Sequence, residues 1–586
     1  MRKTNTPLVL NFLAVDIGGT WIKGAIVKET FLKADLNYIS FEKVKSPLHE
    51  KAQPYELLDA LQNLIKKLRI SPKSIKGIGI STPGIVDYHG TKIVSGNPYL
   101  NILKGEAWKN QLENTFQCQV NFINDADAAT IGLAQLGKLK GNRTVGIMPI
   151  GTGLGFAIWR NGRRWRPGKI LPLLGSITTV KGTFNALVSA SELAKNDKDH
   201  DLTEVLVHPK HQIKRQEYLQ DLINVIISAT TIYGLDEVII SGGLAEAARD
   251  CNYPLQKVLN RNYPEFFTKL DKPLKIIVSE NGNSLQLIGA LSLAKAESIA
   301  YQYREVIPYN KMVTEIPYIK EIQLQNMDSG AIIETMWEAE QRSGEALKES
   351  LSKISNVVDI VVKKIEKGGR IIYVGAGTSG RIAAMDAVEI PCTFGFPKDK
   401  VLVLISGGIT DAALEIETNF EEDASAVPEM LLLDLCPEDS VIGITASGSA
   451  YYVQSALAFA KSKGAYTVMI RSEIAESNQS LCDDVIALHS GHEVIAGSTR
   501  MKAGTATKKV LNFISSAVMI KLGKVAGPYM VNMACINTKL IERAVNIIKS
   551  LYNLTDNEAL QKLKDCNMEL DKVIKTINFF SSENDI

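Results

Sequence analysis

The chain has 586 residues, about four times the usual length of a domain, which indicates more than one folded unit. Hydrophobic residues make up 45% and charged residues 22%, so collagen-like, fully disordered and disulfide-scaffold classes are excluded. The 66 Lys and Arg nearly balance 64 Asp and Glu, giving a net charge of +2, so we expect no nucleic-acid partner.

The N-terminal segment MRKTNTPLVLNFLAVDIGG combines a charged tip with a short apolar run that leads directly into a glycine turn. This arrangement predicts a first strand rather than a signal peptide. No apolar run reaches the roughly 20 residues that a bilayer span needs, so we expect no membrane partner. Seven scattered cysteines form no pairing or metal-ligand pattern and indicate a reducing, cytoplasmic location.

Apolar β-rich runs alternate with helical periodicity along most of the chain, which predicts an α/β fold with largely parallel sheets. The clearest break lies near Glu297 to Lys320, where a helical stretch ends and IPYNKMVTEIPYIKE follows without a clear period. We expect a first domain at 1–300, a linker at 301–325, a second domain at 326–545 and a small helical appendage at 546–586.

The first chemical motif is a glycine turn after the apolar strand Leu13 to Ile17. Gly18 and Gly19 let backbone N–H groups approach phosphate oxygens, Thr20 adds a hydroxyl, and Asp16 can hold Mg²⁺. The alternative is an ordinary tight turn. Two further strand ends carry similar turns, Gly151-Thr152-Gly153 and Gly242-Gly243. Three such turns in this order predict a nucleotide site.

Asp125 follows a strand and precedes an Ala-rich helix, in the segment INDADAA. A carboxylate there can take the proton of a substrate hydroxyl that attacks phosphorus. The alternative interpretation is a helix cap.

These residues resemble the ROK family of sugar kinases, within the actin-like ATPase superfamily, over roughly Leu13 to Ala296. The resemblance implies a two-lobed, ribonuclease H-like kinase fold that uses MgATP, with Asp125 as the catalytic base. It places Asp16 and the turn at Gly151 beside the phosphates, and the Gly242-Gly243 turn at the adenosine. It also implies sugar contacts at Asn97, in the segment SGNPYL, and at Asn124.

One interval departs from that family's pattern. The family usually has a Gly-Glu-x-Gly-His segment and a Cys-rich zinc loop, whereas Lys169 to Thr183 reads KILPLLGSITTVKGT, without Glu, His or Cys. We therefore expect no structural zinc, and a sugar site that is rebuilt or lost. The pair His208 and His211 is expected on a solvated face rather than in a metal site.

The second half opens with a phosphate-type turn. Gly375-Ala376-Gly377-Thr378-Ser379-Gly380-Arg381 follows the strand Ile371 to Val374 and begins a helix. Bare amides, hydroxyls and a helix N-terminus favour an anion. A dinucleotide site is the alternative, since the string fits GxGxxG, although no acidic ribose partner is cleanly placed. A second hydroxyl-rich turn after another strand favours a phosphosugar. The expected phosphate ligands are Thr378, Ser379, Gly380, Arg381, Ser447, Ser449, Ser498 and Lys502.

These turns resemble the SIS (sugar isomerase) fold, and the wider match resembles the N-acetylmuramic acid 6-phosphate etherase family from about Thr314 onward. Its segments here are GAGTSGR, DAVEIPCTFG, ASGSAYYV, GSTRMKAGTATKKVLN and INTKL. The resemblance implies a doubly wound SIS α/β domain with a small helical C-terminal tail, no cofactor and a homodimer. It also implies Glu389 as the acid for lactate release and Glu422 as the second acid/base group.

The acidic residues have other interpretations, and the segments depart from the family in places. Glu389 could be a helix-end carboxylate near a proline, and Glu422 part of a solvated acidic face. The family's Arg-Thr-Pro after ASG is Ser449-Ala450-Tyr451 here, which removes a cation near the expected phosphate. Cys392 stands where the family usually has Pro.

A fused kinase and etherase would perform successive steps on one molecule. We therefore expect a bifunctional enzyme that phosphorylates N-acetylmuramic acid, or a related sugar, and then removes D-lactate. Its expected partners are ATP and a small phosphosugar. The alternatives are an active etherase with an inactive or regulatory kinase-like domain, and a regulatory protein that senses sugar phosphates.

Overall fold

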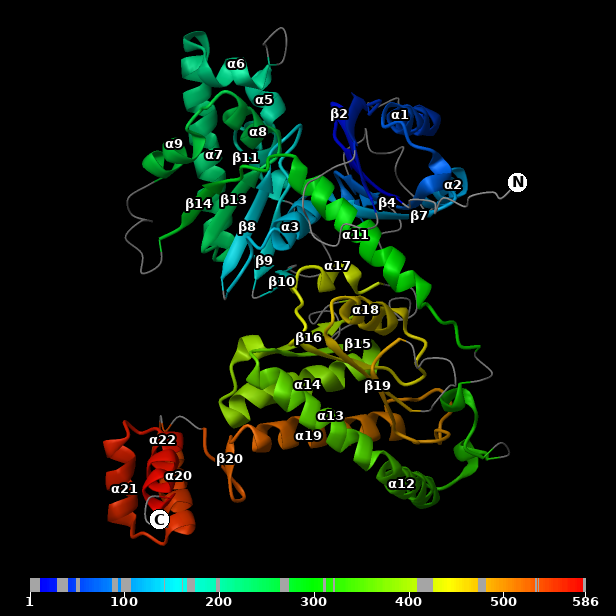
Figure 1. Ribbon diagram of the computed structural model, residues 1–586, viewed down its shortest axis with the longest axis vertical. Helices are drawn as coiled ribbons and strands as arrows, with labels where there is room; N and C mark the ends of the chain where they lie inside the picture. Colours follow the sequence, from blue (N-terminus) through cyan, green and yellow to red (C-terminus); the bar gives the residue numbers. More distant parts are fainter. Residues whose placement is uncertain are drawn as a thin grey trace, which may run out of the picture. The chain divides into compact units, whose positions relative to one another are not determined.

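The computed structural model divides the chain into two compact units (Figure 1). One comprises Met1–Gln302 with Ser425–Asp434, and the other comprises Tyr303–Ala424 with Leu435–Ile586. The structure describes residues 11–28, 40–48, 53–86, 93–95, 107–141, 143–160, 162–165, 174–195, 201–263, 273–308, 312–319, 322–407, 425–472, 481–532, 535 and 537–582.

The first unit begins with a five-stranded sheet in the order β3-β2-β1-β4-β7. Its central strand β1 pairs antiparallel with β2 and parallel with β4. Two helices, α1 (Pro54–Lys67) and α2 (Ala107–Phe116), pack against it through a shared apolar core. The strands are β1 (Asn11–Ile17), β2 (Trp21–Lys28), β3 (Ser40–Lys45), β4 (Ile75–Thr82) and β7 (Gln119–Asn124), with a small separate hairpin of β5 (Ile85–Val86) and β6 (Ile93–Ser95).

A second sheet of the same unit repeats this arrangement in the order β10-β9-β8-β13-β14. Its central strand β8 again pairs antiparallel with the next strand and parallel with a later one. Two sheets of identical strand order confirm the expected two-lobed, ribonuclease H-like fold. The strands are β8 (Thr144–Pro149), β9 (Ala157–Arg160), β10 (Arg163–Trp165), β13 (Glu237–Ser241) and β14 (Lys275–Val278).

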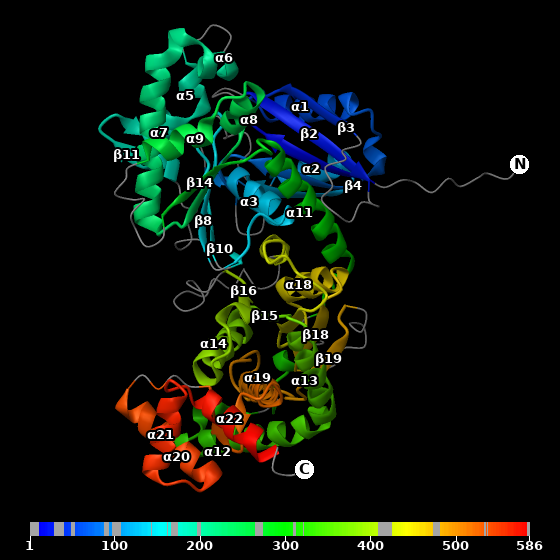
Figure 2. The ribbon, with the colours of Figure 1, turned by 60° about the vertical axis from the view of Figure 1, so that its left-hand side comes forward.

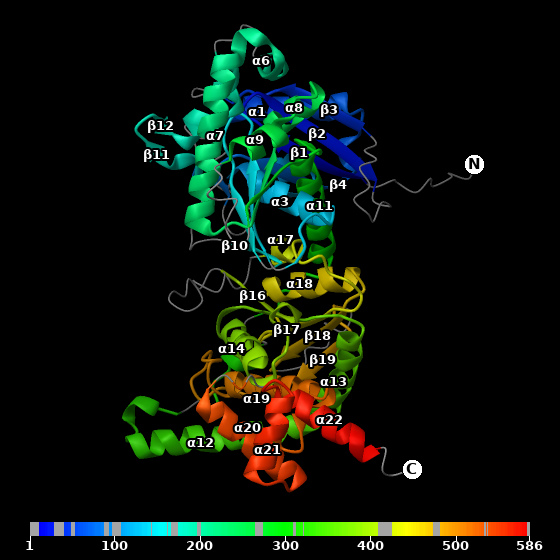
Figure 3. The ribbon, with the colours of Figure 1, turned by 90° about the vertical axis from the view of Figure 1, so that its left-hand side faces the viewer.

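Helices and a short hairpin complete this lobe. The long helix α7 contributes the largest share of its helical core, and the hairpin β11–β12 lies to one side of α7 (Figure 3). The elements are β11 (Thr178–Thr179), β12 (Gly182–Thr183), α4 (Phe184–Val188), α5 (Ala190–Ala194), α6 (Leu202–Val207), α7 (Gln212–Tyr233), α8 (Gly243–Asp250) and α9 (Leu255–Asn262).

The helices α3 (Asp125–Gln135) and α11 (Ser284–Gln302) pack on each other and on the first sheet (Figure 2). Glycines allow this close approach. A Cβ atom on Gly289 would lie 1.9 Å from the carbonyl oxygen of Ala128, and one on Gly79 would lie 1.9 Å from that of Ala290. Any larger residue at these positions would force the elements apart. The short helix α17 (Val427–Met430) also packs on α11.

Glu297 of α11 gives a first testable prediction. Burial raises the pKa of this carboxyl group to about 7, while Ser425 and Lys109 oppose the shift. Because the folded-state pKa exceeds the unfolded value, the stabilising contribution is complete below about pH 4.5 and is lost as the pH rises through 7. Glu297→Gln should therefore raise the free energy of unfolding at pH 8.5 by on the order of 1–3 kcal/mol, with little change at pH 5.

The measurement is denaturant unfolding of wild type and variant at both pH values. Glu280→Gln, at an exposed position of the same unit, is the matched control. It should leave the free energy of unfolding unchanged at both pH values. Parallel pH profiles for wild type and Glu297→Gln would contradict the prediction.

The second unit contains a parallel sheet in the order β16-β15-β17-β18-β19. Helices α13, α14 and α19 cover one face and share its core, while α18 packs on the other face (Figure 1). Helices on both faces confirm the expected doubly wound fold. The elements are α13 (Leu351–Glu366), β15 (Ile371–Gly375), α14 (Gly377–Phe394), β16 (Val401–Ile405), β17 (Ser440–Ile444), α18 (Tyr451–Ser462), β18 (Tyr466–Arg471), β19 (Asp484–Ala487) and α19 (Lys502–Lys521).

The C-terminal part of this unit is a small helical bundle with its own apolar core (Figure 3). Its first helix begins at Thr538, ahead of the boundary that we expected at residue 546. Among the helices that the structure describes, none combines the length and hydrophobicity that a membrane crossing requires. The remaining elements are α12 (Ser329–Ala346), the hairpin of β20 (Val525–Ala526) and β21 (Tyr529–Met530), α20 (Thr538–Tyr552), α21 (Asp556–Asp565) and α22 (Leu570–Ser582).

Candidate functional site

Two glycine-rich turns of the first unit contact each other. They follow β1 and β8, the central strands of the two sheets. The backbone N–H of Gly19 donates a hydrogen bond to Thr152 Oγ1 at 3.3 Å, and a Cβ atom on Gly19 would lie 3.0 Å from that oxygen. The structure thus brings together the residues expected at the phosphates, Gly18–Thr20 and Gly151–Gly153.

The third glycine turn packs against the second. Gly242 has a φ of 82° and precedes α8, and a Cβ atom on it would lie 2.8 Å from the backbone N and O of Ile150. The N–H of Leu244 donates to the carbonyl of Ile150 at 3.0 Å. Only glycine combines this backbone conformation with such a close approach. The turn at Gly242 and Gly243 is therefore next to Gly151. The three glycine turns, which are far apart in the sequence, thus lie together at one surface.

Two carboxylates stand at this surface. Asp16, near the end of β1, is buried and accepts a hydrogen bond from Ser81 Oγ at 2.8 Å. Burial raises its pKa, and the charge of Lys23 opposes this. Asp125 is the first residue of α3, and burial, with the nearby charge of Asp16, raises its pKa to about 7. A carboxyl group that titrates near neutrality can serve as a general base at physiological pH.

The residue that caps α3 is Asn124, not Asp125. The side-chain oxygen of Asn124 accepts from the N–H groups of Ala126 and Asp127, and its amide donates to the carbonyl of Gly84 at 2.8 Å. Both ends of the side chain expected at the sugar are thus occupied within the protein. Asp125 Oδ1 also accepts a hydrogen bond from the N–H of Ala126 at 2.8 Å, so Asn124 holds the N-cap position while Asp125 contacts the first turn of the same helix.

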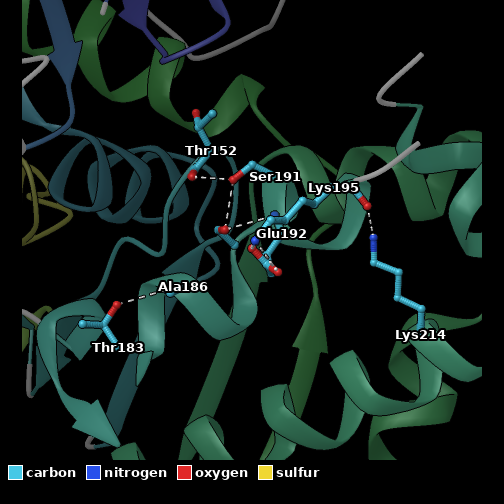
Figure 4. Close-up of polar contacts among 8 residues, drawn as sticks. Thr152, Thr183, Ala186, Ser191, Glu192, Lys195 and Lys214 are labelled. Atoms are coloured by element: carbon cyan, nitrogen blue, oxygen red, sulfur yellow. Dashed lines mark hydrogen bonds and ion pairs between the residues drawn. The ribbon is translucent and has the colours of Figure 1, made fainter. Parts of the chain in front are cut away.

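Two polar residues that the sequence analysis did not single out hold the second turn. Asn185 Oδ1 accepts a hydrogen bond from the N–H of Leu154 at 2.8 Å. Ser191 Oγ donates to the carbonyl of Thr152 at 2.9 Å (Figure 4). They come from α4 and α5, which follow the interval that departs from the family pattern. The positions of Asn185 and Ser191 depend on how these helices pack, and no local sequence motif predicts these two contacts.

In the second unit, two hydroxyl-rich turns lie at the point where the strand order reverses. Counted along the chain, the sheet order is 2-1-3-4-5, so the connections leave β15 and β17 in opposite directions. The crevice beyond the carboxyl ends of such strands is the usual ligand position in open α/β sheets. The turns 375–381 and 445–449 both begin at this crevice.

The turn after β17 is built from small hydroxyl residues. Ser447 Oγ and Ser449 Oγ are 2.6 Å apart, and the N–H of Gly448 donates to Thr445 Oγ1 at 3.2 Å. Gly448 has a φ of 88°, and the guanidinium of Arg471 lies directly beside it. Arg471 is a further residue that the sequence analysis missed.

The turn after β15 packs tightly against its own helix. A Cβ atom on Gly375 would lie 2.7 Å from Gly380 Cα, and one on Gly380 would lie 2.8 Å from Ile405 Cγ2. Gly380 therefore serves close packing. Ala376, which precedes α14, has no polar side chain to cap the helix, so the end that carries Thr378 and Ser379 suits an anion.

The N-terminus of the helix α19, where we expected phosphate to bind, is occupied by a carboxylate of the protein itself. The N–H groups of Lys502 and Ala503 donate to the buried carboxylate of Glu493, at 3.2 and 2.9 Å. Burial raises the pKa of Glu493, and these hydrogen bonds oppose the shift. Lys502 is itself buried, with Nζ 5.1 Å from the centre of the Tyr318 ring. Glu493 thus occupies the helix end near which Ser498 and Lys502 were expected to bind phosphate.

Glu389 lies on the exposed side of α14. Lys508 Nζ is 3.8 Å from Glu389 Oε2 and 3.8 Å from Asp386 Oδ1. Asp386 is buried and accepts hydrogen bonds from Tyr373 at 3.0 Å and Ser515 at 3.2 Å. Burial raises the pKa of Asp386, whereas these hydrogen bonds and Lys508 oppose the shift.

Within one chain, the structure does not place Glu389 beside the phosphate turn. Glu389 comes ten positions after Ser379 in one continuous helix, which corresponds to about 15 Å along the axis. The role expected for Glu389 therefore stays a prediction, and within one chain the helix α14 separates this residue from the turn that carries Ser379. Glu422 and Asn97 lie outside the residues that the structure describes, and so does part of the interval 169–183.

Comparisons with protein families match both units. A model of the ROK family matches residues 12–175, and a model of the glucokinase regulatory protein N-terminal SIS domain matches residues 353–461. The chain is 38% identical over 261 residues to N-acetylmuramic acid 6-phosphate etherase 2 of Bacillus licheniformis, covering 44% of this chain and 88% of that protein. It is 42% identical over 258 residues to the same enzyme of Petrotoga mobilis, covering 44% of this chain and 86% of that protein.

Among solved structures, a ROK family glucokinase of Streptomyces griseus in complex with glucose and AMPPNP aligns with a TM-score of 0.40 and 20% identity, over 49% of this chain and 99% of that one. A ROK hexokinase of Thermus thermophilus aligns with a TM-score of 0.35 and 18% identity, over 49% and 99% of the two chains.

Proposed function

The chain belongs to the N-acetylmuramic acid 6-phosphate etherase family through its C-terminal half, and we propose that this half cleaves the D-lactyl ether of that sugar phosphate. The products are N-acetylglucosamine 6-phosphate and D-lactate. The observation that carries the proposal is the pair of hydroxyl-rich turns at the strand-order reversal of a sheet whose sequence matches this family. All seven cysteines are free, which supports action in the reducing cytoplasm.

The chemistry requires two acid/base groups near one sugar. In the open-chain aldehyde, the carbonyl at C1 acidifies the proton on C2, and a base removes it. The C3–O bond then breaks, and an acid protonates the departing lactyl oxygen. Water adds to C3 and a proton returns to C2, so that atoms and charge balance. We assign the protonation of the lactyl oxygen to Glu389, and we assign Glu422 as the second acid/base group.

We propose that the N-terminal half phosphorylates N-acetylmuramic acid with MgATP, which produces the substrate of the etherase half. Support comes from the contact between the turns at Gly19 and Thr152 and from the raised pKa of Asp125. Asp125 would accept the proton of the attacking sugar hydroxyl. Asp16, a carboxylate at the edge of these turns, fits a Mg²⁺ ion, which when bound neutralises phosphate charge.

The coupled reaction tests both proposals together. Pure protein is incubated with MgATP and N-acetylmuramic acid, and D-lactate is followed over time. Release that depends on ATP supports both activities. Release only from supplied N-acetylmuramic acid 6-phosphate would contradict the kinase proposal for this sugar, and release from neither would contradict the etherase proposal.

We further propose a homodimer in which the partner subunit supplies Glu389 to the phosphate crevice. The distance along α14 separates Glu389 from Ser379 of the same chain. Its neighbours on the helix, Met385 and Val388, are 50% and 63% exposed, so this helix face is available for a second copy. Such a shared site makes a specific prediction about mixed dimers.

Coexpression of Glu389→Gln with Ser447→Ala should restore lactate release that each variant lacks alone. Half of the dimers are then mixed, and each mixed dimer has one intact site, so we expect about a quarter of wild-type activity. The measurement is D-lactate release by the copurified mixture. If the mixture stays as inactive as the single variants, the site lies within one chain.

A further inference from the structure

We propose that Arg471 supplies the positive charge of the phosphate site from beneath the turn formed by Thr445–Ser449. This inference rests on the proposed etherase function and adds a positioning residue to it. The turn itself contains no basic residue, and its side-chain donors are the hydroxyls of Thr445, Ser447 and Ser449.

The sheet places Arg471 at this turn. Arg471 is the last residue of β18, which pairs with β17. The hydrogen bond from the N–H of Ser472 to the carbonyl of Ala446, at 2.9 Å, attaches the end of β18 to the start of the turn. A Cβ atom on Gly448 would lie 3.0 Å from Arg471 Nη1, so the guanidinium fills the space that a side chain at 448 would take.

The guanidinium is enclosed from several sides. The side chain of Arg471 is 1% exposed. Ile307 lies 3.5 Å from the same Cβ position, and Gln454 donates hydrogen bonds to the carbonyls of Gly448 and Glu305. Residues 305–307 thus pack over the turn next to Arg471, which keeps water away from the charge.

A buried guanidinium remains charged at every physiological pH. Its field acts strongly on a phosphate at the neighbouring turn, because little water intervenes to screen it. Arg471 therefore strengthens phosphate binding, while the serine hydroxyls and the N-terminus of α18 make the direct contacts.

The test measures inorganic phosphate as a competitive inhibitor of lactate release from N-acetylmuramic acid 6-phosphate. Charge-assisted interactions of this kind correspond to roughly tenfold or more in affinity. Arg471→Met and Arg471→Gln should raise both the inhibition constant of phosphate and the KM about tenfold or more, with kcat changed much less. Arg471→Lys, which keeps the charge, should recover part of this loss.

Arg304→Met is the matched control. Arg304 lies 4.9 Å from the centre of the Tyr451 ring, at the start of α18, but on the exposed side. This variant should leave the phosphate inhibition constant within twofold. A folded neutral variant at Arg471 with an unchanged inhibition constant would overturn the inference, as would equal losses in the Arg304 variant.

Thermal unfolding with and without phosphate separates this inference from the proposed function. If wild type releases no lactate, the etherase proposal fails, yet stabilisation by phosphate that is lost in Arg471→Gln still supports the role of Arg471. If wild type releases lactate and phosphate stabilises wild type and Arg471→Gln equally, only the role of Arg471 fails.

Discussion

Replacing Asp125 with Asn should reduce ATP-dependent phosphorylation of N-acetylmuramic acid by roughly 10²- to 10⁴-fold, the usual contribution of a positioned general base. Asparagine preserves the shape of the side chain but cannot accept the proton of the sugar hydroxyl. Lactate release from supplied N-acetylmuramic acid 6-phosphate should stay at the wild-type rate. The measurement compares lactate release from the two substrates in the same preparation.

The pH dependence provides a second observable for the same residue. Burial and the charge of Asp16 raise the pKa of Asp125 to about 7, and only the deprotonated form is a base. The kcat/KM for the sugar should therefore be high above pH 7 and fall as the pH drops below it, approaching a tenfold loss per pH unit.

Asp127→Asn is the matched control on the same helix. Asp127 pairs with Arg164 Nη1 at 2.6 Å and is buried, so its removal should lower thermal stability but leave phosphorylation within tenfold. If Asp125→Asn retains wild-type phosphorylation, or if both variants lose it equally, Asp125 is not the base.

Replacing Glu389 with Gln should reduce lactate release from N-acetylmuramic acid 6-phosphate by roughly 10²- to 10⁴-fold. Glutamine cannot donate a proton to the departing lactyl oxygen, so the C3–O bond would have to break without acid assistance. Because the other unit is untouched, the variant supplied with MgATP and N-acetylmuramic acid should accumulate the 6-phosphate. Phosphosugar and lactate are quantified in the same reaction.

Glu366→Gln, at an exposed position on α13, is the control and should leave lactate release unchanged. Glu389 lies close to Lys508, so loss of its charge also changes the ion-pair network with Asp386. Thermal unfolding of Glu389→Gln separates this effect from chemistry. A folded variant that releases lactate at the wild-type rate would contradict the assignment of Glu389.

The fold classes and the start of each phosphate-type turn can be inferred directly from the residues. A strand that ends in Gly-Gly or in a serine-rich turn is a local signal, because backbone conformation at these residues depends mainly on glycine and on short hydroxyl side chains. The turns at Gly18, Gly151, Gly242, Gly375 and Ser447 could therefore be found by inspection. The two-lobed fold of the first unit followed from the resemblance that these turns carry, whereas the pairing of the individual strands became visible only in the structure.

Which side chains meet in space depends on contacts between distant parts of the chain. Asn124 rather than Asp125 caps α3, Glu493 occupies the start of α19, and Arg471 reaches the serine turn because β18 pairs with β17. The same applies to the separation of Glu389 from Ser379, which follows from the continuous helix between them. Such relations depend on strand order, helix length and burial, which arise from contacts between residues far apart in the chain, and no local pattern of residues encodes them.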